Sequence, residues 1–324
     1  MVGLLVAGTL AELALRSAGF EYRHYPTQIQ FGWPDPETLE TKFEPDPDLF
    51  WVLSDYDEIL DAAQKPDLVF MGDSCTHLGH YPEYLRALYE QRHPQQHLRT
   101  LRAAVTGWST HQGRVQLERD LLPLSPRVIT VYFGWNDHWL SMGLTDREMA
   151  SQRLDYRYFP ALYRSRVAQL LFRFYTERFV LAGIDERPVR VPPADFRANL
   201  VQLVGMARAH DIAPVLITAP SAHREGREPE LLLGRWVVEL DELIPMHQQY
   251  VGIVRQVAGE HRVPLLDLAR RFEAQPEDDW RKRYFMHDGI HLQPEGDQLI
   301  ARWLLQLLTR ERLLPSSGPP AAPR

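Results

Sequence analysis

Residues 67–76 have the sequence DLVFMGDSCT, and this stretch decides the fold. The run from Asp67 to Met71 is short and mostly apolar, and it stops at Gly72, as expected of a buried strand in a parallel sheet. The glycine permits a tight turn, which would place Ser74 at the start of the following helix. There the helix dipole and the free backbone N–H groups favour developing negative charge.

The rest of the chain alternates between strand and helix patterns around this unit. Four further runs are typical of buried strands: Leu98–Val105, Arg127–Phe133, Pro214–Thr218 and Val263–Asp267. Helical patterns lie between or after them: Tyr81–Arg92, Ala194–His210, Leu243–His261 and Glu295–Arg310. Such alternation means βαβ crossovers. The sequence therefore predicts an α/β fold, a flavodoxin-like three-layer α/β/α sandwich with a five-stranded parallel sheet.

Chemically useful residues follow the predicted strands, at the sheet edge where open α/β folds bind ligands. Gly107 ends the second strand, and its missing side chain leaves a backbone N–H accessible. Asn136 follows the third strand within GWND and offers an amide donor. Asp288 and His291 lie in DGIH, just before the last helix. With Ser74 they supply a nucleophile, an orienting acid and a general base.

These four blocks, in this order, resemble the SGNH (GDSL-type) hydrolase family. The blocks are GDS at 72–74, Gly107, GWND at 134–137 and DGIH at 288–291, and the resemblance covers roughly residues 66–310. Many family members have leucine where this chain has Cys75, a change that keeps a small apolar side chain. The Gly-x-Ser-x-Gly elbow of α/β-hydrolases is not met, because position 76 is threonine.

The resemblance implies a serine esterase that cleaves an acyl ester through an acyl-enzyme. Ser74 would attack the acyl carbonyl, His291 would act as general base and acid, and Asp288 would orient the imidazole. The oxyanion hole would combine the backbone N–H groups of Ser74 and Gly107 with the Asn136 amide. No cofactor and no metal is expected. Family habit points to O-acetyl or short acyl groups on a carbohydrate.

Other interpretations of the same residues stay open. Ser74 fits a helix N-cap, and Gly107 and Asn136 fit ordinary turns. The same triad would also serve an O-acyltransferase that works with a membrane partner. A metal-dependent enzyme is a third class, because His287, Asp288 and His291 are ligand types with a histidine pair at i, i+4. That hypothesis leaves the glycines and Asn136 unexplained.

Two stretches interrupt the alternation. Residues 20–60 are rich in aromatics, proline and aspartate, and they predict an irregular wrap around the domain. Residues 139–193 form a long insertion between the third and fourth strands, dense in arginine and aromatics. The insertion fits either an accessory helical core or a lid or membrane-facing surface. Trp108 and Trp135, beside the oxyanion groups, fit either core positions or a platform for a sugar ring.

The N-terminal segment 1–19 is apolar from Val2 to Leu15 except for Thr9 and Glu12. Fourteen helical residues reach about 21 Å, less than the ~30 Å hydrocarbon core of a bilayer. We expect a membrane anchor with an extracytoplasmic catalytic domain; the alternative is a first helix packed on a soluble cytoplasmic protein. Residues 20–314 would form the hydrolase domain, and 315–324 a disordered tail.

Composition limits the remaining classes. The 324 residues carry a net charge of −7, with 44% hydrophobic and 24% charged residues. Enough apolar surface is present for a packed core, so a disordered chain is excluded. No basic excess exists to neutralise phosphates, which argues against a nucleic-acid partner. The single cysteine, Cys75, excludes an intramolecular disulfide.

Overall fold

The computed structural model divides into two compact units. One unit comprises Met1–Val52 and Ser141–Pro188, and the other Leu53–Leu140 and Val189–Arg324. The structure describes residues 2–22, 42–141, 143–151, 164–175, 178, 187–234, 236–276 and 280–315.

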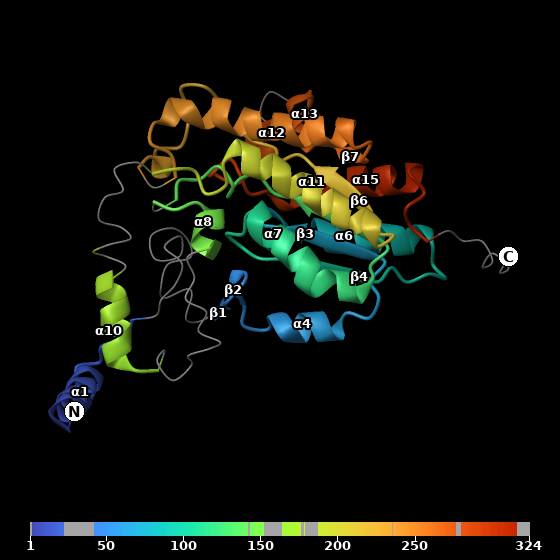
Figure 1. Ribbon diagram of the computed structural model, residues 1–324. Coiled ribbons are helices and arrows are strands. Elements are labelled where there is room, and N and C mark those ends of the chain that lie inside the picture. Colours follow the sequence, from blue (N-terminus) through green and yellow to red (C-terminus); the bar gives the residue numbers. More distant parts are fainter. Residues whose placement is uncertain are drawn as a thin grey trace. The chain divides into compact units, whose positions relative to one another are not determined.

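The larger unit is built on a five-stranded parallel sheet of order β4-β3-β5-β6-β7 (Figure 1). The strands are β3 (Leu68–Gly72), β4 (Thr100–Ala104), β5 (Val128–Tyr132), β6 (Ala213–Ile217) and β7 (Leu265–Leu266). Every residue of β3 and β5 is buried, as the apolar runs predict for strands covered on both faces. The five predicted strands are confirmed, with β7 reduced to two residues.

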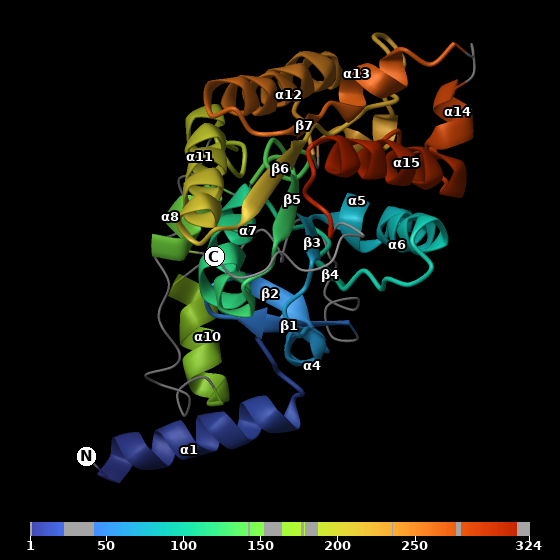
Figure 2. The same cartoon turned by 90° about the vertical axis from the view of Figure 1, so that its right-hand side faces the viewer.

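Helices cover both faces of this sheet (Figure 2). They are α5 (Ser74–His77), α6 (Tyr81–Arg92), α7 (Thr110–Gln116), α11 (Pro193–Ala209), α12 (Leu243–Glu260), α13 (Leu268–Glu273), α14 (Trp280–Tyr284) and α15 (Pro294–Arg310). In Figure 2, α6 and α15 lie on one side of the sheet, and α7 and α11 lie on the other. The predicted α/β/α sandwich is therefore confirmed.

Burial explains why these helices form where they do. In α15 the apolar residues Ile300, Leu304 and Leu308 recur every four positions and are fully buried. This stripe packs in the same core as Leu85 and Tyr89 of α6. Burying one such leucine contributes about 1.5–3 kcal/mol, so tertiary packing rather than local propensity fixes both helices.

The segment expected to be irregular contains regular structure in its described part. β1 (Phe43–Asp46) and β2 (Phe50–Leu53) form a two-stranded sheet, and α4 (Tyr56–Ala62) follows. The Asp46 carboxylate accepts the backbone N–H groups of Asp48 and Leu49, both at 2.7 Å, and so closes the turn between the strands. The expectation was wrong here because proline and aspartate mark a turn as well as a loop; residues 23–41 lie outside the described residues.

The smaller unit contains α1 (Val2–Ser17), α8 (Asp146–Ser151) and α10 (Arg166–Tyr175). Within the part of the chain that the structure describes, no helix has both the length and the apolar character needed to span a bilayer. Much of the 139–193 insertion and the predicted tail from residue 316 onward lie outside the described residues.

Candidate active site

The turn after β3 places Ser74 at the carboxyl edge of the sheet. Asp73 is the N-cap of α5, and its Oδ1 accepts the Cys75 N–H at 2.9 Å. Ser74 is thus the first helical residue, and the alternative that it caps the helix is wrong. Gly72 is required by close packing, because an added Cβ would overlap Thr76 and lie 2.8 Å from the Tyr132 carbonyl oxygen.

The structure brings Ser74, His291 and Asp288 into one hydrogen-bonded chain. Ser74 Oγ lies 2.8 Å from His291 Nε2, and His291 Nδ1 lies 2.6 Å from Asp288 Oδ2. The other carboxylate oxygen of Asp288 accepts the backbone N–H groups of Ile290 and His291, at 2.9 and 3.0 Å. These two bonds fix the carboxylate, which in turn fixes the imidazole.

The pKa values of Asp288 and His291 are both shifted in the direction that favours the charged form of each residue. Burial alone would lower the pKa of His291, but the hydrogen bond and charge of Asp288 outweigh it and raise that pKa above 6.5. Burial would raise the pKa of Asp288, but its bonds to His291 and to two backbone N–H groups hold that pKa below 3.8. An imidazolium formed on His291 would therefore be stabilised where it stands.

The loop that carries Asp288 rests on the segment after β6. His223 Nε2 donates to the Asp288 carbonyl oxygen at 2.7 Å, and the Ala222 N–H donates to the Gly289 carbonyl oxygen at 2.9 Å. Ser221 Oγ lies 3.0 Å from His223 Nδ1. Gly289 has φ +72°, and a Cβ there would lie 2.7 Å from the His223 ring. Sequence reasoning missed His223, although it follows a predicted strand at the ligand-binding edge.

Gly107 follows β4, which ends at Ala104, and has φ +82°, a backbone conformation that favours glycine. Arg190 Nη1 donates to its carbonyl oxygen at 2.6 Å and fixes the peptide. Among the described residues, the backbone N–H groups of Ser74 and Gly107 have no acceptor.

Asn136 is more constrained than the sequence indicates. Its Nδ2 donates to the Trp108 carbonyl oxygen at 3.0 Å and to Asp73 Oδ2 at 3.2 Å. Burial raises the pKa of Asp73 to about 6. Trp108 and Trp135 are fully buried, so they are core residues and not an exposed platform for a sugar.

A buried histidine pair joins the GWND block to the segment after β6. His138 Nε2 lies 3.0 Å from His247 Nδ1, and His247 Nε2 donates to the Ala219 carbonyl oxygen at 3.0 Å. The Trp135 ring stacks on His247 with centroids 3.8 Å apart. Burial lowers the pKa of His247 to about 3, so the pair is neutral and structural at physiological pH.

The residues of the metal hypothesis are not assembled as a metal site. Among the described residues, no group of three His, Cys, Asp or Glu side chains is arranged to hold a metal ion. His287 is exposed, whereas Asp288 and His291 bond to each other and to Ser74. His77 Nδ1 lies 2.7 Å from Thr106 Oγ1.

Residues 70–299 match the GDSL-like Lipase/Acylhydrolase family. The isoamyl acetate-hydrolyzing esterase of Saccharomyces cerevisiae is 26% identical over 125 residues, 37% of this chain and half of that protein's length. The uncharacterized lipoprotein YqeF of Bacillus subtilis is 23% identical over 251 residues, 72% of this chain and 86% of that protein.

The fold also resembles solved structures. The lipase/acylhydrolase from Enterococcus faecalis aligns with a TM-score of 0.50 at 18% identity, covering 78% of this chain and all of that one. The likeness concerns the fold, and the family match covers all four sequence blocks.

Proposed function

Because the chain belongs to the GDSL-like lipase/acylhydrolase family, whose chemistry is ester hydrolysis, we propose that it cleaves acyl esters through Ser74, His291 and Asp288. The observation that carries this proposal is the hydrogen-bonded chain from Ser74 Oγ through His291 to Asp288, at 2.8 and 2.6 Å. It stands at the carboxyl edge of the sheet, where this fold class binds ligands.

The geometry suits a two-step acyl transfer. His291 Nε2 accepts the Ser74 proton as Oγ attacks the carbonyl carbon, and the Asp288 carboxylate stabilises the imidazolium. The tetrahedral intermediate collapses as His291 returns the proton to the leaving alcohol. An acyl-enzyme on Ser74 remains, and water activated by the same imidazole releases the carboxylic acid.

The oxyanion hole in this proposal consists of two backbone donors and one side-chain donor. The N–H groups of Ser74 and Gly107 have no acceptor among the described residues, which supports their role. The Asn136 amide would turn from Asp73, the longer of its two contacts at 3.2 Å, toward the developing negative charge. Each such donor contributes about 10²–10³ in kcat.

The proposed substrates are short acyl esters, with acetyl first, and the proposed alcohol part is a carbohydrate. The name of the yeast relative states that it hydrolyses isoamyl acetate, an ester of a short acid. The carbohydrate part rests on family habit alone. A transferase would use the same acyl-enzyme and differ only in the acceptor, so product analysis separates the two reactions.

The proposed location is a membrane, with the catalytic unit outside the cytoplasm. Support comes from the apolar segment at residues 2–15 and from the relative named a lipoprotein, which aligns with 72% of this chain. A cytoplasmic location is the alternative. Fractionation of cells that express the full chain, followed by protease treatment of intact cells, separates the two locations.

The experiment that tests the function is hydrolysis of p-nitrophenyl esters of increasing acyl length. We expect acetate and butyrate to be cleaved by wild type and by Cys75→Ala, which changes the neighbouring buried side chain. Ser74→Ala should lose the activity. Hydrolysis by Ser74→Ala at the wild-type rate would refute the proposed nucleophile, and transfer of acetyl to an added sugar in preference to water would assign a transferase.

A further inference from the structure

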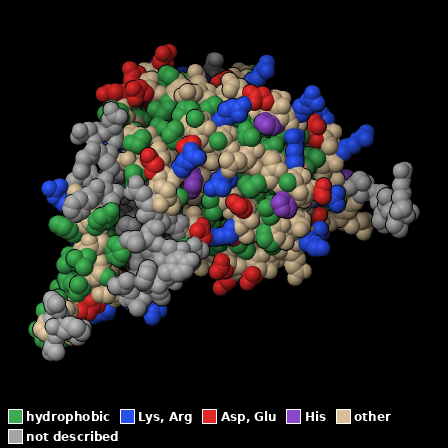
Figure 3. Space-filling model, in the orientation of Figure 1, with side chains coloured by type: hydrophobic (Ala, Val, Ile, Leu, Met, Phe, Trp, Pro, Cys, Tyr) green, Lys and Arg blue, Asp and Glu red, His purple; other side chains and the backbone are tan. Residues whose placement is uncertain are grey.

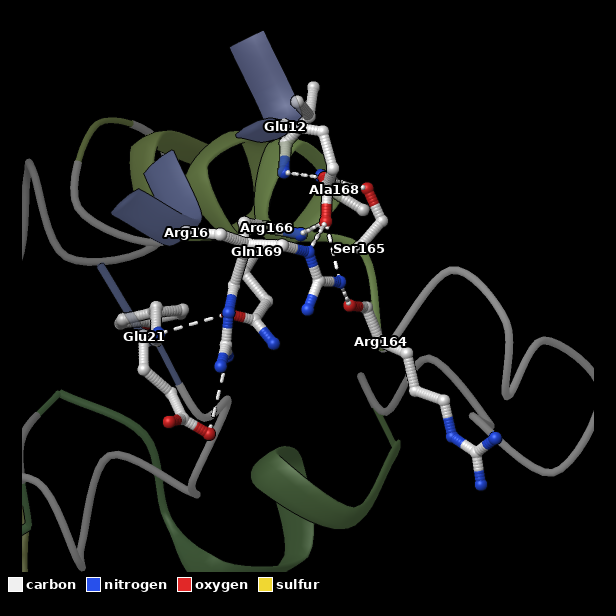
Figure 4. Close-up of polar contacts among 10 residues, drawn as sticks. Glu12, Arg16, Glu21, Arg164, Ser165, Arg166, Ala168 and Gln169 are labelled. Carbon is white, nitrogen blue, oxygen red and sulfur yellow. Dashed lines mark hydrogen bonds and ion pairs between the residues drawn. The ribbon is translucent and has the colours of Figure 1, made fainter. Parts of the chain in front are cut away.

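In the smaller unit, α1 and α10 are joined through polar groups (Figure 4). The Glu12 carboxylate of α1 accepts the backbone N–H groups of Arg166 and Val167, at 2.9 and 3.0 Å, and the Ser165 hydroxyl at 2.9 Å. Ser165 Oγ in turn accepts the Ala168 N–H at 3.3 Å. Glu12 and Ser165 together therefore satisfy the first three N–H groups of α10.

Further polar contacts extend this junction. Arg16 donates to Glu12 at 2.8 Å and to the Arg164 carbonyl oxygen at 2.8 Å. The buried side chain of Gln169 accepts the Tyr22 N–H at 3.1 Å and an Arg166 Nη1 proton at 2.9 Å. The hydrogen bonds lower the pKa of Glu12 to about 2, so the carboxylate stays charged in the junction.

Seven large apolar side chains of the same two helices are exposed. Val6, Leu10 and Leu13 form an i, i+4, i+7 stripe on α1, and each is more than half exposed. On α10 the exposed apolar side chains are Leu170, Leu171, Phe174 and Tyr175. Among the described residues, these seven account for more than half of the twelve large exposed hydrophobic side chains. Figure 3 shows hydrophobic side chains gathered over α10.

This arrangement is the reverse of a helix pair that is stable in water. Helices in water bury their apolar stripes against each other and expose polar groups. Here polar groups fill the junction and the apolar stripes are exposed. The exposed faces gain free energy only when an apolar phase covers them.

The charge of the two helices differs in sign from that of the chain. Three arginines and one glutamate occupy α1 and α10, and Arg164 lies just before α10, whereas the whole chain has a net charge of −7. Arg16 on α1, Arg173 on α10 and Arg164 before α10 are exposed. Exposed arginines that flank Leu, Phe and Tyr on one helix surface complement the acyl boundary and the anionic head groups of a bilayer.

We propose that α1 and α10 form one interfacial element, which lies on the surface of an anionic bilayer and is held together by Glu12. The apolar side chains of both helices enter the boundary between head groups and acyl chains, and the arginines contact lipid phosphates. This inference rests on the proposed membrane location and identifies the protein surface that contacts the membrane. It does not depend on the ester chemistry.

The test is flotation of the full-length protein with vesicles of phosphatidylcholine alone or mixed with phosphatidylglycerol. Wild type should float with the mixed vesicles and less with the neutral ones. The double variant Leu171→Ser/Phe174→Ser should bind at least about tenfold more weakly. The matched control Leu231→Ser/Val238→Ser alters two side chains of similar exposure in the larger unit and should bind as wild type does.

The proposal is overturned by the absence of wild-type flotation with either vesicle, or by flotation of the Leu171/Phe174 variant equal to that of wild type. A dimer in solution that the same substitutions dissociate would assign the surface to a second copy and also overturn it. Ser74→Ala should float as wild type does, and the Leu171/Phe174 variant should hydrolyse a soluble acetate ester as wild type does. Failure of the ester chemistry and failure of the membrane surface are thus distinguishable.

Discussion

At the scale of single residues, the candidate site depends on how each polar group is held. The sequence blocks predict that Ser74, Asp288 and His291 lie near one another, because each follows a strand or precedes a helix, and in the structure hydrogen bonds join the three. They do not predict the Asp73 and Trp108 contacts of Asn136, which depend on side chains far apart in the chain. Nor do they predict the contact between His223 and Asp288, which are separated by 65 positions.

The charge of Asp288 should be visible in the pH dependence. Acylation needs neutral His291, so kcat/KM should rise as pH increases through a pKa above 6.5. Asp288→Asn removes the charge that raises this pKa, and the acidic limb should move to lower pH while the maximal rate falls about 10⁴-fold. Profiles of kcat/KM from pH 4 to 9 on one soluble ester measure the position of the acidic limb and the maximal rate. An acidic limb at the same pH in wild type and Asp288→Asn would show that Asp288 does not set the pKa of His291.

His223 should act as a positioning residue through the Asp288 carbonyl oxygen. His223→Ala removes the hydrogen-bond donor to the Asp288 carbonyl oxygen, so Asp288 and His291 should be displaced from their positions. We therefore expect kcat to fall about tenfold to a hundredfold, with little change in KM because substrate binding is unaffected. His223→Gln retains a donor and should recover part of the loss. Steady-state kinetics of the two variants measure this, and a wild-type kcat in His223→Ala would contradict the role.

At the scale of elements, the strand and helix periods in the sequence predict the sheet and its covering helices well. The β1–β2 pair was missed because its strands are four residues each and the turn chemistry of Asp46 dominates the pattern. The contact of Glu12 with the start of α10 joins residues more than 150 positions apart. No local pattern carries that information.

The turn from β3 into α5 should be sensitive to a single methyl group. Gly72→Ala would force a Cβ against Thr76 and the Tyr132 carbonyl, and the free energy of unfolding should fall by about 1–3 kcal/mol. Gly252→Ala, within α12, meets no atom within 4 Å and should raise it by about 0.5–1 kcal/mol. Chemical denaturation of both variants tests the difference, and equal stabilities would refute the packing argument.

At the scale of the whole molecule, composition predicts a folded chain with a large core, and the four blocks predict its family. The family match over residues 70–299 confirms that identification. The division into two units and the exposed apolar side chains of α1 and α10 could not be predicted. Both depend on the surface against which each apolar helix face packs. Hydrophobic periodicity predicts that such a face exists, but it does not predict the surface that contacts it.

Stability should decrease as pH rises through the titration of buried Asp297. This carboxyl accepts the His80 N–H at 2.8 Å, and burial raises its pKa from 3.8 to about 6. The native state therefore binds the proton more tightly than the unfolded chain. The stability that this contributes is complete below about pH 3.8 and is lost as pH rises through about 6.

Asp297→Asn removes that titration, so its stability relative to wild type should increase between pH 4 and 6. Denaturant unfolding at several pH values measures the free energy of unfolding of both proteins. The difference between the two values removes the contribution of the other carboxyl groups, which both proteins share. A difference that stays constant over this range would show that the pKa of Asp297 is not raised.

The proposed ester chemistry requires that Ser74 is a nucleophile activated by His291 and Asp288. The most direct test is labelling with a fluorophosphonate, read by intact mass and by the modified peptide, on wild type, Cys75→Ala and Ser74→Ala. We expect one adduct on Ser74 in wild type and in Cys75→Ala, and none in Ser74→Ala. A folded wild type that takes no label, or a Ser74→Ala protein labelled to the same extent, would contradict it.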